Sequence, residues 1–109
     1  MPGMSRIEKL KIIKEKKMKK ITAFEYNGCP YCAQAKKAIE ELIKENPEYG
    51  KIEIEWIEEH KHPEIIANYD YQSTPAMFID KEKIYESHLY ESFDECKTGI
   101  KEVFDRAIS

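Results

Sequence analysis

The sequence has no long apolar run and few of the residues that mark a secreted chain. Its 109 residues include only four glycines and three cysteines. No stretch of about 18 apolar residues is present that could span a bilayer. The N-terminus also lacks the apolar core of a secretory signal. Three cysteines are too few, and odd in number, for a disulfide-stapled scaffold. We therefore expect a cytoplasmic protein without a membrane partner.

The residues that are present are typical of one compact domain. The chain is 41% hydrophobic and 36% charged, with a formal net charge of -3. Its seven tyrosines, four phenylalanines and single tryptophan supply enough buriable surface to offset the entropy of ordering a chain of this length. A small folded core is expected.

Positive charge is concentrated at the start of the chain. Residues 1–20 hold eight Lys or Arg and two Glu, whereas the remainder holds ten Lys or Arg against nineteen Asp or Glu. Ser5 and Glu8 have the spacing of a capping box, and apolar residues follow at helical spacing. We expect a basic helical extension over residues 1–18 and a folded domain over residues 19–109. A nucleic-acid partner is not expected, because interleaved aromatic residues and a basic domain are both missing.

After the basic segment, apolar periodicity predicts four strands and three helices. The expected strands cover residues 21–26, 52–56, 77–79 and 84–89. The expected helices run from Pro30 to about residue 46, over residues 62–69, and from Ser92 to the end of the chain. The order is β-α-β-α-β-β-α, which begins with a βαβ unit and ends with a hairpin and a helix. An α/β fold with a four-stranded mixed sheet flanked by helices, and with the extra N-terminal helix, is predicted.

The segment Cys29-Pro30-Tyr31-Cys32 carries the clearest chemistry. It lies between a strand end and a helix start, where unpaired backbone N–H groups and the helix dipole stabilise a thiolate. Cys29 is the predicted nucleophile, and Cys32, one helical turn inward, is the predicted resolving thiol. Pro30 stiffens the turn, and Tyr31 offers a surface against which a partner's thiol can lie.

A zinc site is an alternative for the same cysteines, because half a zinc site has the same spacing. The two further ligands would be His60 and His62. This spacing matches no common zinc finger, and placing the cysteines at a helix start favours thiol exchange. An iron–sulfur cluster shared by two chains is a weaker metal alternative, because the second thiol favours disulfide closure. We therefore predict no metal and no bound organic cofactor.

The sequence resembles the glutaredoxins and glutaredoxin-like members of the thioredoxin superfamily. The resemblance covers about residues 19–109 and rests on Cys29-Pro30-Tyr31-Cys32 after a strand and on Ser73-Thr74-Pro75 before one. It implies a thioredoxin-like fold in which Pro75 is cis and lies against the active-site sulfurs. It also implies that the backbone of Thr74 pairs with an extended segment of the substrate.

Several features are more similar to glutaredoxin than to thioredoxin. The residues between the cysteines are Pro-Tyr rather than Gly-Pro, no Trp precedes Cys29, and Ala23 stands where thioredoxins carry a buried acid. The Gly-Gly pair with which many glutaredoxins bind glutathione is absent from the sequence. Glutathione as a co-substrate and a thioredoxin-type reductase as an electron donor therefore both stay open.

The sequence thus predicts a monomeric thiol–disulfide oxidoreductase that reduces protein or small-molecule disulfides. A non-catalytic interaction module with the same fold and a metal-binding protein are the alternatives. Cys96 and Trp56 lie on apolar stripes and are expected in the core. Tyr69 and Tyr71 either edge a substrate groove near Pro75 or cap the sheet.

Overall fold

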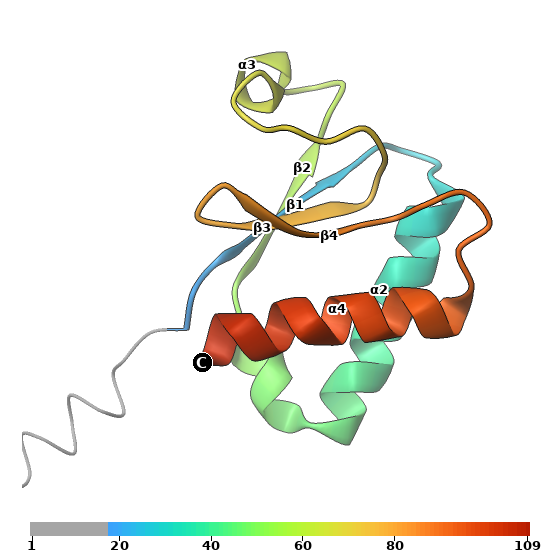
Figure 1. Cartoon of the computed structure of the whole chain (residues 1–109), viewed down its shortest axis with the longest axis vertical. Helices are drawn as coiled ribbons and strands as arrows, with labels where there is room; N and C mark the ends of the chain where they lie inside the picture. Colours follow the sequence, from blue (N-terminus) through green and yellow to red (C-terminus); the bar gives the residue numbers. More distant parts are fainter. Residues whose placement is uncertain (1–17) are drawn as a thin grey trace, which may run out of the picture.

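The computed structural model describes residues 18–109, which form three layers with a sheet in the middle (Figure 1). The elements are β1 (Ile21–Glu25), α2 (Pro30–Glu45), the 3-10 helix η1 (Pro47–Lys51), β2 (Ile54–Glu58), α3 (Pro63–Ile66), β3 (Ala76–Ile79), β4 (Glu82–Glu86) and α4 (Phe93–Ile108). This order confirms the predicted succession of strands and helices and adds one short 3-10 helix. The predicted N-terminal helix lies outside the described residues. No helix in the described part is long and apolar enough to cross a membrane.

The four strands form one mixed sheet in the order β2-β1-β3-β4. β1 runs parallel to β2 and antiparallel to β3, and β3 forms a hairpin with β4. The hairpin loop is Asp80-Lys81, with φ values of 50° and 68°, the left-handed pair that a two-residue type I′ turn requires. β4 ends at Glu86, three residues earlier than predicted. Residues 87–89 therefore form a loop rather than a strand.

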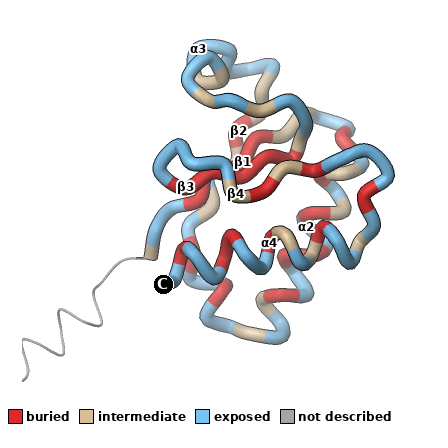
Figure 2. The backbone as a smooth tube through the Cα atoms, in the orientation of Figure 1, coloured by how far each residue is buried: buried red, intermediate tan, exposed pale blue. Residues whose placement is uncertain are grey.

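Helices α2 and α4 cover one face of the sheet (Figure 1). Their apolar stripes are buried together, as the alternation of buried and exposed positions in Figure 2 shows. The stripe of α4 includes Cys96, which is fully buried as expected. The predicted capping box is present, because the Ser92 side chain accepts from the backbone N–H of Glu95 and the Glu95 carboxylate accepts from that of Ser92.

A second, aromatic cluster covers the opposite face of the sheet beside α3. The Tyr71 ring stacks on Phe24 with centroids 4.8 Å apart, and the Tyr69 ring meets Phe24 edge-on. Phe78 contacts both tyrosine rings. Of the two roles considered for Tyr69 and Tyr71, covering the sheet is therefore the one that the structure supports.

Trp56 is only half-buried, so its predicted place in the core is partly wrong. It packs against the buried apolar residues between the sheet and helices α2 and α4. The Lys36 Nζ lies 4.8 Å from the centre of its ring. β2 is an edge strand, which leaves one side of this tryptophan uncovered. The buried residue of β2 is Ile57, on the opposite face.

Candidate active site

Cys29 caps the N-terminus of α2. The chain turns into the helix at Gly28, whose φ of 87° suits glycine, and Pro30 occupies the first helical turn. The Cys29 Sγ accepts a hydrogen bond from the backbone N–H of Cys32 at 3.1 Å. The sulfur therefore faces both an N–H donor and the positive end of the helix dipole, an arrangement that stabilises a negative charge on it.

Cys32 differs from Cys29 in hydrogen bonding more than in exposure. The exposed fractions of the two residues are 5% for Cys29 and 3% for Cys32, so the expected difference in solvent shielding is small. Burial, and next the hydrogen bond with Cys29, raises the pKa of the Cys32 thiol to about 12. Cys32 therefore stays a protonated thiol near neutral pH, and the backbone donor at the start of α2 is directed at Cys29.

The loop before β3 lies against the Cys29 sulfur. The Thr74–Pro75 peptide is cis, as the resemblance implied, and Pro75 is buried. The Cys29 Sγ lies 3.8 Å from the backbone oxygen of Thr74 and 3.7 Å from its Oγ1. Residues far apart in the sequence, Cys29 and Thr74, thus meet at one end of the sheet.

Ser87 fixes this loop from the side of β4. Its Oγ donates to the Thr74 backbone oxygen at 2.6 Å, and its N–H donates to the Pro75 oxygen at 3.0 Å. The sequence reasoning placed Ser87 inside a strand and missed this role. The polar run Glu86-Ser87-His88 is a signal that would have favoured a loop there.

A groove of about 290 Å³ is lined by Thr74, which contacts the Cys29 sulfur, and by Tyr31, but neither cysteine is among its lining residues. Its lining residues are Tyr26, Tyr31, Glu59, Gln72, Ser73, Thr74, Ser87, His88 and Leu89. Glu59 is the only carboxylate among them, and they include no Lys or Arg. The predicted partner surface, Tyr31, lies in this groove, and its hydroxyl also accepts a hydrogen bond from the Tyr90 N–H at 2.8 Å.

Among residues 18–109, no group of three or more His, Cys, Asp or Glu side chains is arranged to hold a metal ion. His60 lies 3.4 Å from a Glu58 oxygen, and His62 lies 3.4 Å from a Glu64 oxygen. The two histidines therefore do not join Cys29 and Cys32 in a ligand set, and the zinc alternative gains no support from the described residues.

Comparisons with known proteins agree with the fold. The chain is similar to thioredoxin 1 of the thermophilic eubacterium Thermosipho africanus TCF52B, with 22% identity and a TM-score of 0.51 over 79% of this chain and 94% of that one. It is also similar to Fasciola hepatica thioredoxin, with 22% identity and a TM-score of 0.54 over 93% and 90% of the two chains. At this identity the two structures establish the fold alone, and a search of curated proteins finds no match.

The sequence profile of the thioredoxin domain matches residues 19–87, a span that contains both cysteines and the Thr74–Pro75 peptide. Nothing in this match or in the two structures separates glutaredoxins from thioredoxins, so the glutaredoxin resemblance stays a prediction. The profile covers well over half of the chain. The match supports thiol–disulfide oxidoreductase activity in general, and the chain belongs to the thioredoxin domain family.

Proposed function

We propose that the protein is a glutaredoxin-like dithiol oxidoreductase that reduces protein or small-molecule disulfides through Cys29 and Cys32. One observation carries the proposal. The Cys29 sulfur caps α2 and accepts from the Cys32 N–H, whereas the raised pKa of Cys32, about 12, keeps its thiol protonated. These two differences assign the nucleophile to Cys29 and the resolving thiol to Cys32, one helical turn further into α2.

The reaction begins when the Cys29 thiolate attacks one sulfur of the substrate disulfide. The Cys29–substrate disulfide forms, the substrate S–S bond breaks, and the first substrate thiolate leaves and takes up a proton. Cys32 then loses its proton and attacks the Cys29 sulfur, which releases the second substrate thiol and forms the Cys29–Cys32 disulfide. The substrate gains two electrons and two protons, and the dithiol loses them.

Formation of the mixed disulfide itself favours the second step. Burial is the largest cause that raises the pKa of Cys32, the hydrogen bond with Cys29 is the next, and the charge of Cys29 adds a smaller effect. When the Cys29 sulfur is bonded to the substrate, it no longer carries that charge. That contribution to the pKa of Cys32 then disappears, which makes the loss of its proton easier, while the effect of burial remains.

The glutaredoxin-like assignment rests on Pro-Tyr between the cysteines and on Ala23, which is fully buried at the centre of β1 without a carboxylate. No metal or organic cofactor takes part in the proposed exchange. The electron donor for the cycle is either glutathione or a thioredoxin-type reductase. We propose a cytoplasmic, monomeric protein, in keeping with the sequence.

The test is equilibration in a series of reduced and oxidised glutathione buffers, followed by thiol quenching and mass measurement. We expect a Cys29–Cys32 disulfide that forms in a two-electron transition, and a trapped glutathione adduct on Cys29 in the Cys32→Ser variant. A persistent adduct supports glutaredoxin-type exchange, whereas a disulfide without any adduct favours a thioredoxin-type dithiol exchanger. Absence of the Cys29–Cys32 disulfide under all buffers refutes the proposed function.

Two variants serve as controls for this experiment. Cys29→Ser removes the nucleophile and should abolish turnover. Cys96→Ala removes a buried thiol that lies outside the groove, so it should form the Cys29–Cys32 disulfide as the wild type does. Alkylation adds a further check, because Cys29 should react much faster than Cys32 near neutral pH.

A further inference from the structure

The loop from Ser87 to Glu91 forms one wall of the active-site groove. Ser87, the first residue of the loop, donates hydrogen bonds to the backbone oxygens of Thr74 and Pro75. At the other end, the Glu91 carboxylate is buried and accepts a hydrogen bond from the Tyr85 hydroxyl. Between these anchors, Leu89 lines the groove and has most of its surface exposed. The position of Leu89 thus depends on what holds the middle of the loop.

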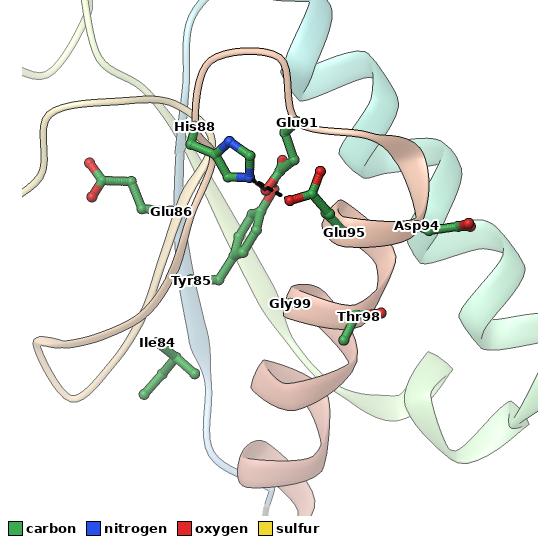
Figure 3. A pocket seen from close by; sticks show the side chains of 9 residues that line it. All are labelled: Ile84, Tyr85, Glu86, His88, Glu91, Asp94, Glu95, Thr98 and Gly99. Atoms are coloured by element: carbon green, nitrogen blue, oxygen red, sulfur yellow. Dashed lines mark hydrogen bonds and ion pairs between the residues drawn. The ribbon is translucent and has the colours of Figure 1, made fainter.

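Two contacts hold the middle of the loop. The Tyr90 N–H donates to the Tyr31 hydroxyl, and His88 uses both nitrogens of its ring. Its Nδ1 lies 3.0 Å from the backbone oxygen of Leu89, and its Nε2 lies 3.0 Å from an oxygen of Glu95 in α4 (Figure 3). A carbonyl and an ionised carboxylate can only accept hydrogen bonds. A neutral imidazole carries one N–H and can make only one of the two bonds, whereas the imidazolium makes both.

The charged groups nearest to His88 are carboxylates, which favour its cation. A second carboxylate oxygen, from Glu91, lies 3.9 Å from the Nε2. The cavity behind the loop, seen in Figure 3, is lined from β4 by Tyr85 and Glu86 and from α4 by Asp94 and Glu95. The titratable groups on the groove side are Tyr26, Tyr31 and Glu59. Neither set of lining residues contains a Lys or Arg.

The bond to the Leu89 oxygen, followed by the one to Glu95, raises the pKa of His88 above its ordinary value of 6.5. Glu95, for its part, has a lowered pKa because it accepts from the Ser92 backbone and side chain, so it stays ionised over this range. The two-sided contact is therefore complete below pH 6.5 and is lost as the pH rises through the raised pKa of His88.

We propose that His88, as an imidazolium, is a positioning residue that ties Leu89 in the groove wall to the first turn of α4 and so sets how well the groove holds a protein disulfide. This inference rests on the proposed function. When His88 loses its proton, its hydrogen bond to either the Leu89 carbonyl or the Glu95 carboxylate is lost, and the loop that carries Leu89 becomes more mobile. Binding of an extended partner segment weakens, whereas the exchange between the sulfurs themselves does not involve His88.

The experiment measures KM and kcat for insulin reduction by the full chain between pH 5.5 and 8.5. Bis(2-hydroxyethyl) disulfide, which is too small to fill the groove, is the comparison substrate. For the wild type, the KM for insulin should rise about two- to fivefold as His88 deprotonates, the range that an exposed ion pair supports. The KM for the small disulfide should not follow this titration.

Three variants isolate the effect of His88. In His88→Asn, the histidine-linked rise in KM should vanish. Glu95→Gln preserves the capping box but removes the charge, so the rise should move to lower pH. His62→Asn is the matched control, because His62 is an exposed histidine beside a carboxylate but outside the groove, and its profile should equal that of the wild type. The same pH dependence of KM in the wild type and in His88→Asn would overturn the inference.

Imidazole NMR separates failure of the inference from failure of the proposed function. His88 should titrate with a midpoint above 6.5, and the amide signals of Leu89 and Tyr90 should follow the same midpoint. The inference is overturned, even in an active protein, if the His88 midpoint is at or below 6.5. It is also overturned if the amide signals of Leu89 and Tyr90 do not change with the His88 titration. If the protein reduces neither disulfide but the coupled titration is observed, the proposed function is rejected while the contact made by His88 stands.

Discussion

Replacement of Tyr85 by phenylalanine tests the buried contact behind the groove wall. Tyr85 lies in β4, and its hydroxyl donates to the Glu91 carboxylate and lies 3.3 Å from the Cys96 Sγ. Burial is the main cause that raises the pKa of both Tyr85 and Glu91. The phenol therefore stays a protonated donor at every working pH. Tyr85→Phe preserves the ring and removes only this donor.

The expected loss follows from the burial of Glu91, whose side chain is only 3% exposed. An acceptor left without its donor in such a place costs about 1–3 kcal/mol, and a charged one lies toward the upper end. We expect Tyr85→Phe to lower the free energy of unfolding by about 2 kcal/mol at pH 7. For a domain of this size, that corresponds to a fall in Tm of about 8–16 °C.

The loss should also depend on pH. The folded pKa of Glu91 is already above its ordinary value, and removal of the Tyr85 donor raises it further. A raised carboxyl pKa costs stability once the pH exceeds the unfolded value. The difference between variant and wild type should therefore grow as the pH rises through the pKa of Glu91, and it should be smaller in acid. Urea unfolding between pH 4 and 8 measures this.

Tyr71→Phe is the matched control for the same experiment. The Tyr71 hydroxyl donates to Glu59 at 2.7 Å, but this contact is only partly buried and water can replace it. We expect a loss of about 0.5–1 kcal/mol there. Equal losses for the two variants, or an unchanged stability of Tyr85→Phe at pH 7, would refute the reasoning.

Three further variants test α4 by thermal unfolding, and a fourth, Leu89→Ala, is their exposed control. Ser92→Ala removes the helix cap and should cost about 1 kcal/mol; a loss near zero would contradict the cap. Gly99→Ala would place a Cβ 2.5 Å from the Tyr85 ring, so strain of about 1–3 kcal/mol should outweigh the helix gain of about 1 kcal/mol and alter the tyrosine near-UV signal. Net stabilisation would contradict that contact. Phe104→Ala opens the fully buried core and should cost about 3–5 kcal/mol, whereas the exposed Leu89→Ala should change stability by less than about 0.5 kcal/mol.

Local patterns were sufficient to predict the main helices. The stripe at helical spacing after Pro30 and the capping-box pair Ser92 and Glu95 both predict elements that the structure contains. These signals depend on residues within a few positions of one another, and for that reason a single sequence carries them. The 3-10 helix η1 and the early end of β4 were not predicted, because short elements and strand ends depend on the neighbours that they pair with.

The candidate site divides in the same way. The spacing of Cys29 and Cys32 and their place before a helix indicate the chemistry without a structure. The resemblance implied that Pro75 lies against the sulfurs, whereas the contacts with the Cys29 sulfur come from the neighbouring residue Thr74. These contacts join two loops 45 positions apart in the chain, so no local pattern could predict them.

The sequence by itself thus determined the order of the elements, the amphipathic faces of α2 and α4, and the place of Cys29 and Cys32 at the start of a helix. Only the tertiary structure decided that Ser87 holds the Thr74 carbonyl, that Glu91 is buried against Tyr85, and that His88 bridges its own loop and α4. The physical reason is that hydrogen bonds across loops leave no periodic trace in the sequence. Their partners are chosen when the sheet and helices bring distant polar groups together, and there each buried polar group must find a partner.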